Sequence, residues 1–264
     1  MTTIQSLIIS IVEGLTEFLP ISSTGHIIIA EKLLHVPDSD FTKLFTVAIQ
    51  LGAILAVVVL YWRKFFNFSN WQFYAKLIVG VIPAIIIGFL FSKKIDALLE
   101  STTTVAIALI AGGVILLFID GMFKRARIHD EKGVSYLNSF IIGCWQCLAM
   151  VPGVSRSAAS IIGGMQQKMT RRAAAEFSFF LAVPTMLAAT GYKMLKYYKE
   201  SGGFSHEEIK LLAIGNIASF LVAVLAIRFF IGFLQKHGFR VWGIYRIILG
   251  LILFALMYSG FLPQ

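Results

Sequence analysis

The sequence has few charged residues, and this scarcity limits which class of protein it can be. Charged residues make up 14% of its 264 residues, whereas a soluble domain carries about 25%. Hydrophobic residues reach 58%, and the mean hydropathy is +0.81. A soluble fold could not hide this much apolar surface from water, so the composition excludes an ordinary soluble domain and predicts an integral membrane protein.

Cysteine is scarce as well. Its two residues, Cys144 and Cys147, have the CxxC spacing of a redox pair or half a zinc site, but no second half follows. Two small buried residues on a helix are the simpler interpretation. Residues 1–20 lack a basic start, so we expect no cleavable targeting segment. The net charge of +9 favours basic loops that face anionic lipid over binding of nucleic acid.

A helix needs about 20 predominantly apolar residues to cross a membrane. Six segments meet this requirement, and polar or basic loops separate them. They are residues 44–62, 76–92, 104–123, 174–192, 211–231 and 243–261.

Two further apolar segments, 4–34 and 137–168, do not fit a single span. Each has two short apolar arms around a polar tip that contains proline. The arms are too short to cross alone but long enough to enter the membrane and return. Each segment therefore predicts a re-entrant hairpin, with one broken spanning helix as the alternative.

The two hairpins align with each other. One offset relates Pro20 to Pro152 and Ser23 to Ser155, which predicts two copies of one unit, residues 1–125 and 136–264. Each copy has one hairpin and three spans, and this odd number of crossings turns the second copy upside down. The sequence thus predicts one all-α integral membrane domain, residues 1–264, with six spanning helices and two re-entrant helical hairpins in an inverted-topology repeat. Sites in such folds lie near the midplane.

The charge of the loops predicts an orientation. Loops near 63–76, 124–132, 168–172 and 228–240 carry mainly Lys and Arg, whereas loops near 31–43, 93–100 and 193–210 mix Lys with Asp and Glu. The positive-inside rule places the first group in the cytoplasm. Both termini and the opening of the first hairpin then face outward.

The first tip contains most of the polar residues expected inside the membrane, where charged groups are costly and usually functional. They are Glu13, Glu17, Ser22, Ser23, Thr24 and His26. Glu13 and Glu17 are four residues apart and share a helix face, so they need a cation, a shared proton or a nearby Arg. The hydroxyls at a helix start favour an anion such as phosphate.

The second tip supplies Ser155, Arg156 and Ser157. The planar guanidinium of Arg156 suits phosphate oxygens. Inverted symmetry would bring this tip against the first, and the combined set could bind a phosphate, supply a nucleophile and move a proton. Gln50, in the first span, faces either this site or a neighbouring helix.

Simpler interpretations remain open for several residues. Hydroxyl groups in membrane helices often bond the preceding turn. Arg156 could form a structural ion pair with Glu13 or Glu17, and His26 could be an interior histidine. Glu176 and Arg246 are read as structural.

At these residues the sequence resembles a known family. EGLTEFLPISSTGH at 13–26 and PGVSRSAAS at 152–160 resemble the undecaprenyl-pyrophosphate phosphatases of bacteria, also called bacitracin-resistance proteins. IQLGAILAVV at 49–58 and EFSFFLAVP at 176–184 extend the resemblance along the chain. Many relatives have Gly where this chain has Ala158, a change between small residues.

The resemblance implies a membrane enzyme that removes the terminal phosphate of a polyprenyl pyrophosphate and so recycles the lipid carrier of cell-wall synthesis. It implies a multi-pass protein of the bacterial inner membrane, and we expect the site to open to the periplasmic side. Our hypothesis makes Ser23 the nucleophile and His26 its base or the proton donor, with Arg156 on the phosphate. Phospho-His26 or direct attack by water are the alternatives.

We expect Glu13 and Glu17 to hold a divalent cation, Mg²⁺ or Ca²⁺, because oxygen ligands suit these ions, or else to position water. Ser22, Thr24, Ser155, Ser157 and Gln50 would bind substrate. A transporter or flippase of a phosphorylated polyprenyl lipid is the alternative function, because inverted repeats with broken helices are typical of transporters. A structural scaffold would leave the buried charges unexplained. The oligomeric state stays open, with a homodimer as one option.

Overall fold

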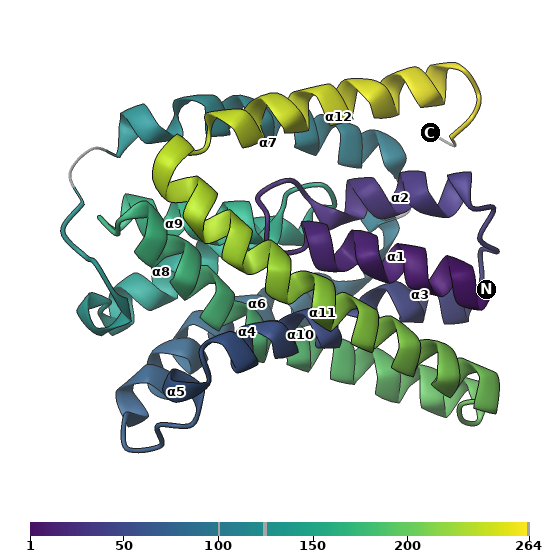
Figure 1. Cartoon of the computed structure of the whole chain (residues 1–264), viewed down its shortest axis with the longest axis horizontal. Coiled ribbons are helices and arrows are strands. Elements are labelled where there is room, and N and C mark those ends of the chain that lie inside the picture. The colour runs from purple at the N-terminus through teal and green to yellow at the C-terminus, as the bar shows by residue number, and fades with distance from the viewer. Residues whose placement is uncertain (100, 124–125, 263–264) are drawn as a thin grey trace.

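The structure is a computed structural model that describes residues 1–99, 101–123 and 126–262, without the side chains of residues 92–99. The described part is helical, apart from one isolated bridge between Ile128 and Met169. Its helices, shown in Figure 1, are α1 (Thr3–Thr16), α2 (Ser23–Leu33), α3 (Asp40–Ala48), α4 (Gln50–Leu60), α5 (Trp62–Phe65), α6 (Trp71–Leu99), α7 (Thr102–Met122), α8 (Tyr136–Cys147), α9 (Arg156–Gln166), α10 (Arg171–Ser201), α11 (His206–His237) and α12 (Arg240–Tyr258), with 3-10 turns at Glu131–Gly133 and Leu148–Met150.

Six helices are long and apolar enough to cross a membrane, as the sequence predicts: α3 with α4, α6, α7, α10, α11 and α12. Their outer faces carry large apolar side chains, such as Leu225 (67% exposed) and Phe229 (59% exposed) on α11. This apolar surface needs lipid around it. The all-α integral membrane fold with six spanning helices is therefore confirmed.

The first span differs from the prediction of one continuous helix over 44–62. It is broken at Ile49, between α3 and α4. The side chain of Asn216 on α11 inserts here, and its Oδ1 accepts the backbone N–H of Gly52 at 2.7 Å. A side chain that enters the backbone hydrogen-bond ladder is a recognised cause of such breaks. The sequence of the span alone does not contain this partner.

The predicted hairpins form two pairs of short helices, α1 with α2 and α8 with α9. In Figure 1 the first pair lies at the end of the molecule that holds the N-terminus, and the second lies toward the opposite end. The connecting segments, which we name tip 1 (residues 17–22) and tip 2 (residues 148–155), meet in the interior. Passage of these hairpins into and out of a membrane stays a prediction.

The two halves of the chain are interleaved. α1 packs on α11, α8 packs on α6, and α7 packs along α12. The backbones come very close where α8 crosses α6, because a Cβ at Gly143 would lie 2.1 Å from the carbonyl oxygen of Gly80. Only glycine permits such an approach. Each hairpin is thus fixed by a helix of the other half.

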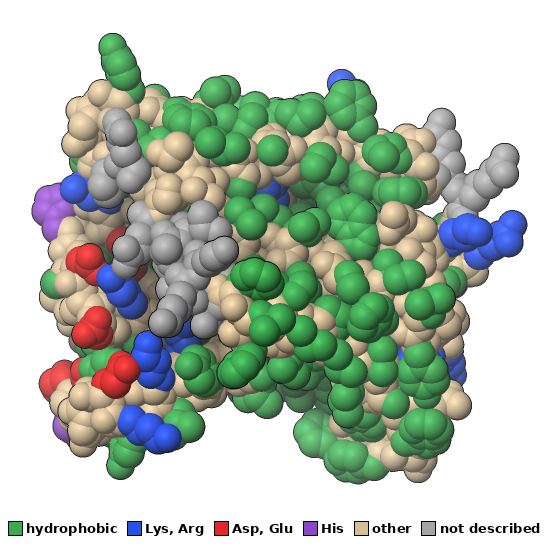
Figure 2. Space-filling view, turned by 180° about the vertical axis from the view of Figure 1, so that it is seen from behind, with side chains coloured by type: hydrophobic (Ala, Val, Ile, Leu, Met, Phe, Trp, Pro, Cys, Tyr) green, Lys and Arg blue, Asp and Glu red, His purple; other side chains and the backbone are tan. Residues whose placement is uncertain are grey.

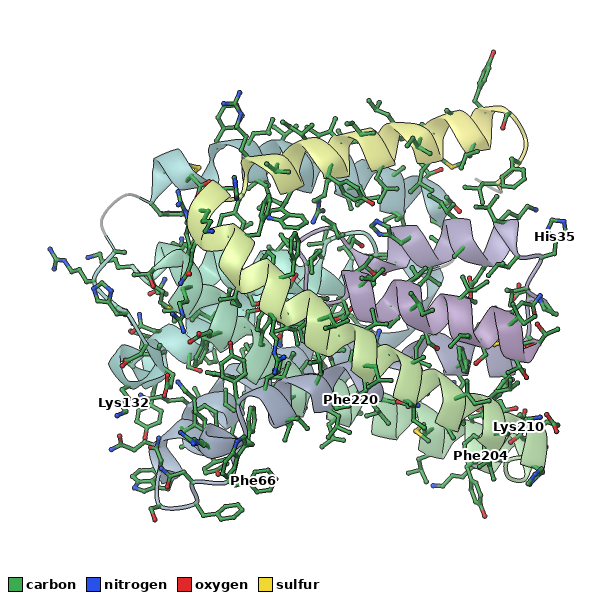
Figure 3. All side chains as sticks on the ribbon, in the orientation of Figure 1. His35, Phe66, Lys132, Phe204, Lys210 and Phe220 are labelled. Carbon is green, nitrogen blue, oxygen red and sulfur yellow. The ribbon has the colours of Figure 1, made fainter. Side chains whose placement is uncertain are left out.

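Charged side chains gather at the two ends of the molecule and leave an apolar band between them (Figure 2). Acidic and basic side chains mix at one end, and those visible at the other are basic. Lys210 and Lys132 lie at opposite ends (Figure 3), as the predicted charge split requires. The predicted charges at 93–100 and 124–125 lie outside the described side chains. The expected burial of the cysteines is wrong for Cys144, which is exposed on α8.

Candidate active site

The end of α1 and the start of tip 1 place two acidic side chains inside the protein. Glu13 lies on α1 and is fully buried, and neither carboxylate oxygen has a hydrogen-bond partner among the described residues. Glu17 follows one turn later, where α1 ends. Ser22, before α2, has a φ of +66°, which is unusual for a residue other than glycine. This conformation turns the chain sharply, so that α2 begins beside the two carboxylates.

Glu17 joins the two tips. Its Oε2 accepts the hydroxyl of Ser23 at 2.8 Å, and its Oε1 accepts Nη2 of Arg156 at 3.1 Å. The side chains of Glu17 and Arg156 are only 9% and 12% exposed. Charge-assisted hydrogen bonds in such a shielded place are strong and directional. The three predicted residues therefore form one connected chain, from Ser23 through Glu17 to Arg156.

Arg156 is held on its other side by α10. Its Nη1 donates to the carbonyl oxygen of Ser178 at 3.1 Å and to the Ser178 hydroxyl at 3.3 Å. Its guanidinium also lies over the ring of Phe18, 5.5 Å from the ring centre. Ser160 shares a hydrogen bond of 2.6 Å with the Ser178 hydroxyl. These contacts fix the orientation of the guanidinium, while its Nε has no partner among the described residues.

Ser155 and Ser157 connect the tips rather than face a free space. The Ser157 hydroxyl donates to the carbonyl oxygen of Leu19 at 2.8 Å, and the Ser155 hydroxyl lies 3.0 Å from that of Ser157. Ser155 also caps α9 by accepting the N–H of Ala158. Within the described residues, no hydrogen bond joins Thr24 or Gln50 to the rest of the predicted site. The binding roles of these two residues stay predictions.

His26 lies near the same tip but points elsewhere. Its Nδ1 is 2.8 Å from the carbonyl oxygen of Ser22, and its Nε2 is 2.7 Å from the hydroxyl of Tyr245 on α12. Among the described residues, no hydrogen bond joins His26 to Ser23. The acceptor that Ser23 contacts in this structure is Glu17, and the role of His26 as base or as proton donor to the leaving group stays a prediction.

Arg246, one residue further along α12, is 1% exposed and donates to four backbone carbonyls. They belong to Ala108 and Leu109 of α7, at 3.0 and 3.3 Å, to Pro20 of tip 1, at 3.2 Å, and to Gly153 of tip 2, at 3.0 Å. The guanidinium thus connects both tips and α7 to α12, the helix that carries Arg246. The structural reading of Arg246 agrees with these contacts, and we add that they hold the site together.

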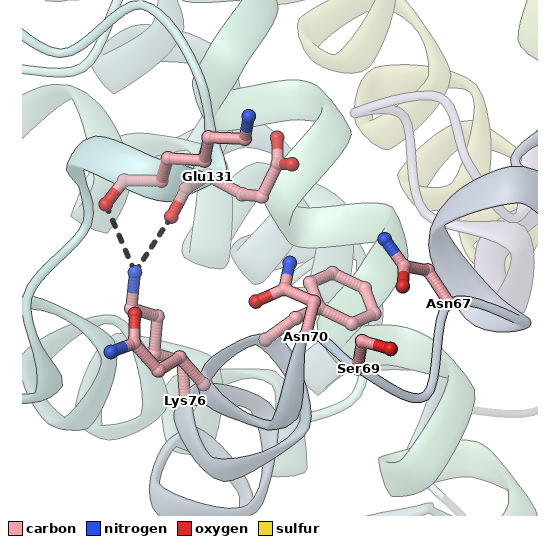
Figure 4. A pocket seen from close by; sticks show the side chains of 8 residues that line it. Asn67, Ser69, Asn70, Lys76 and Glu131 are labelled. Atoms are coloured by element: carbon pink, nitrogen blue, oxygen red, sulfur yellow. Dashed lines mark hydrogen bonds between the residues drawn. The ribbon is translucent and has the colours of Figure 1, made fainter.

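A pocket of about 420 Å³ lies away from the tips, at the corner between α5 and α6 (Figure 4). Asn67, Ser69 and Asn70 contribute to its lining. The buried Lys76 donates to the carbonyl oxygens of Glu131 and Lys132, at 3.1 and 3.0 Å. The pocket thus lies where Lys76 connects two loops, and none of the predicted site residues lines it.

Sequence reasoning missed Ser178 and Tyr245. Ser178 lies within the EFSFFLAVP segment, which carries part of the resemblance, so that segment was the available signal. Tyr245 stands in an apolar helix with no local motif. Glu176, read as structural, forms an ion pair of 2.9 Å with Arg172 on the same helix.

The described residues do not by themselves provide enough ligands for a metal ion. Among the described residues, no group of three or more His, Cys, Asp or Glu side chains could hold an ion. Glu13 nevertheless offers two unpaired carboxylate oxygens. Mg²⁺ commonly uses one or two carboxylates together with substrate phosphates. The residues present fit a hard cation that a pyrophosphate would help to hold.

Comparison with known proteins identifies the family of the chain. The family described as bacitracin resistance protein BacA matches residues 6–252. The chain is similar to an undecaprenyl-diphosphatase of Flavobacterium psychrophilum, with 58% identity over 96% of this chain and 95% of the relative. It is also 54% identical to that of Flavobacterium johnsoniae, over 96% of this chain and 95% of the relative. For the Aquifex aeolicus protein of the same name the identity is 43%, over 96% and 97%. The chain therefore belongs to the bacitracin resistance protein BacA family.

Proposed function

We propose that the two tips form the active site of an undecaprenyl-diphosphatase. The enzyme hydrolyses undecaprenyl pyrophosphate to the monophosphate and inorganic phosphate, and it returns the lipid carrier to cell-wall synthesis. The connected chain of Ser23, Glu17 and Arg156 carries the assignment to this site. It places a hydroxyl, a base and a phosphate-binding cation together inside a membrane protein. The transporter alternative is not favoured, because the relatives carry the name of a phosphatase.

The geometry supports Ser23 as nucleophile. The Ser23 hydroxyl donates a hydrogen bond of 2.8 Å to Oε2 of Glu17, so Glu17 can accept its proton as the oxygen attacks the terminal phosphorus and undecaprenyl monophosphate leaves. Arg156 is held by Glu17 and Ser178 beside the same hydroxyl, where it can stabilise the charge of the transition state. Water then releases the phosphate from Ser23. A phosphorylated His26 and direct attack by water are the other routes to test.

Glu13 and Glu17 would hold the divalent cation, Mg²⁺ or Ca²⁺. A fully buried carboxylate without a partner is costly, so Glu13 needs a proton or a cation in the working enzyme. When bound, the ion neutralises charge on the pyrophosphate. Glu17 is already engaged by Ser23 and Arg156, which leaves Glu13 as the freer ligand.

The membrane arrangement is also part of the proposal. The exchange of partners between the halves, α1 on α11 and α8 on α6, supports an inverted repeat in which each hairpin is re-entrant. The basic loops of the opposite end would face the cytoplasm, and the opening of the first hairpin would face the periplasm. The protein would then act at the bacterial inner membrane on its outer side. Its state as monomer or homodimer is left to direct measurement.

Release of phosphate from undecaprenyl pyrophosphate by the purified protein in detergent tests the function. Ser23→Ala and Arg156→Gln should each lose at least about 100-fold in kcat, whereas Ser259→Ala, at the exposed end of α12, should retain full activity. Substrate labelled in the terminal phosphate should leave a trapped label on Ser23. Full turnover by Ser23→Ala, or label on His26 alone, would contradict the serine route.

A further inference from the structure

The imidazole of His26 has one polar contact at each nitrogen. On one side the carbonyl oxygen of Ser22 lies 2.8 Å from Nδ1, and on the other the hydroxyl of Tyr245 lies 2.7 Å from Nε2. The rings of His26 and Tyr245 are nearly parallel, at 7°, with centres 5.6 Å apart. Ser22 belongs to tip 1, whereas Tyr245 belongs to the last helix. The histidine therefore bridges the first hairpin and α12.

The two contacts decide which nitrogen can exchange a proton. A backbone carbonyl only accepts hydrogen bonds, so Nδ1 must carry a hydrogen in both charge states of the ring. Nε2 is then the nitrogen that gains or loses a proton. A phenol suits both states, because it donates to a neutral Nε2 and accepts from a protonated one. Tyr245 is thus the side chain that faces the titrating nitrogen.

The position of Tyr245 is fixed by its neighbour. Arg246 ties α12 to the carbonyls of Pro20 and Gly153, so the phenol is held at a set distance from tip 1. A histidine ring rotates easily about its last side-chain torsion. One hydrogen bond at Nδ1 leaves some of this freedom, and a second bond at Nε2 removes it.

We propose that Tyr245 is a positioning residue that orients His26 through Nε2 during phosphate removal. The proposal rests on the proposed function. It has protonated His26 give its Nε2 proton to the leaving oxygen of the lipid monophosphate and regain a proton from the water of the second step, while Glu17 accepts the proton of the Ser23 hydroxyl. Among the described residues, no hydrogen bond joins the phenol to the Ser23–Glu17–Arg156 chain, whereas one joins it to His26, so it acts through the histidine.

Tyr245→Phe keeps the ring and removes only the hydroxyl. We expect kcat to fall about tenfold, as for loss of one hydrogen bond, while KM stays within about twofold. Tyr258→Phe is the matched control, since Tyr258 is on the same helix and 96% exposed. The double variant with His26→Gln should lose no more activity than His26→Gln alone, because one residue acts through the other.

A second readout does not depend on turnover. In protein labelled with ¹⁵N-histidine, assigned with His26→Gln, Tyr245→Phe should shift the Nε2 resonance of His26 and leave Nδ1 in place. An unchanged Nε2 resonance, or losses that multiply in the double variant, would overturn the proposal. Absence of phosphate release by the wild type would instead contradict the proposed function, while the resonance still reports the contact.

Discussion

The buried guanidinium of Arg246 gives a quantitative test of how the site is held. Arg246→Leu removes the hydrogen bonds to Pro20 of tip 1 and to Gly153 of tip 2. The two α7 carbonyls keep their helical partners, and Gly153 keeps a bond of 3.1 Å from Ser155. Within the described residues, the carbonyl of Pro20 has no other donor. Tip 1 therefore loses its bond to α12 but keeps the hydroxyls of Ser155 and Ser157 on Leu19, and tip 2 loses one of its bonds.

A hydrogen bond from a charged donor contributes about 1.5–3 kcal/mol, so the two tips lose at least ~3 kcal/mol of anchoring. If this loss appears in the transition state, kcat falls about 100-fold. Global stability should change less, because leucine avoids the burial of a charge. We expect the kcat of Arg246→Lys to lie between those of the wild type and Arg246→Leu, since an ammonium has three donors for four carbonyls.

Phosphate release in detergent measures the effect on kcat, and the melting temperature checks that the variants fold. Arg240→Leu provides the control, because Arg240 is on the same helix and exposed. If folded Arg246→Leu kept kcat within about threefold of the wild type, the tips would not depend on this residue and our reasoning would be wrong.

Three further predictions follow from buried or crowded groups. Chelation should abolish phosphate release, and Glu13→Gln should raise the half-saturating Mg²⁺ concentration about tenfold; an unchanged value would exclude Glu13 as a ligand. Gly52→Ala places a Cβ 2.1 Å from the Asn216 carbonyl oxygen and should destabilise the fold by about 1–3 kcal/mol, whereas Gly191→Ala, with open space, should not lower the melting temperature. Burial, with a neighbouring acidic charge, raises the pKa of Glu31 from 4.5 to about 7. Between pH 4.5 and about 7 the folded state then keeps a proton that the unfolded chain releases, so the free energy of unfolding should fall as the pH rises through this range. Thermal melts of Glu31→Gln should show a smaller fall over the same range.

The sequence predicted the spanning helices because their signal is local. An apolar run of sufficient length can only lie in lipid or in a core, and 264 residues offer no core large enough for six of them. The break at Ile49 was missed, since its cause is Asn216, a residue of another helix.

In the site too, the features with a local sequence signal could be predicted, and those that depend on distant residues could not. Glu17, Ser23 and Arg156 stand in polar segments that interrupt apolar sequence, so they could be found by their cost in a membrane. Which of them contact each other needed the three-dimensional structure, in which the Ser23 hydroxyl donates to Glu17 and not to His26. Tyr245 and the anchoring role of Arg246 could not be read from sequence, because their partners are backbone atoms or residues more than half the chain away.

The interleaving of the two halves has a consequence for how the protein is made. The hairpin α1–α2 leaves the ribosome long before its partner α11 and before α12, which carries Arg246. At about 5–20 residues per second, the roughly 200 intervening residues take on the order of 10–40 s. During this interval Glu13 lacks the helix that covers α1. The first hairpin must therefore pack on α3, α4 and α7 without α11 and α12 until those two helices have been synthesised.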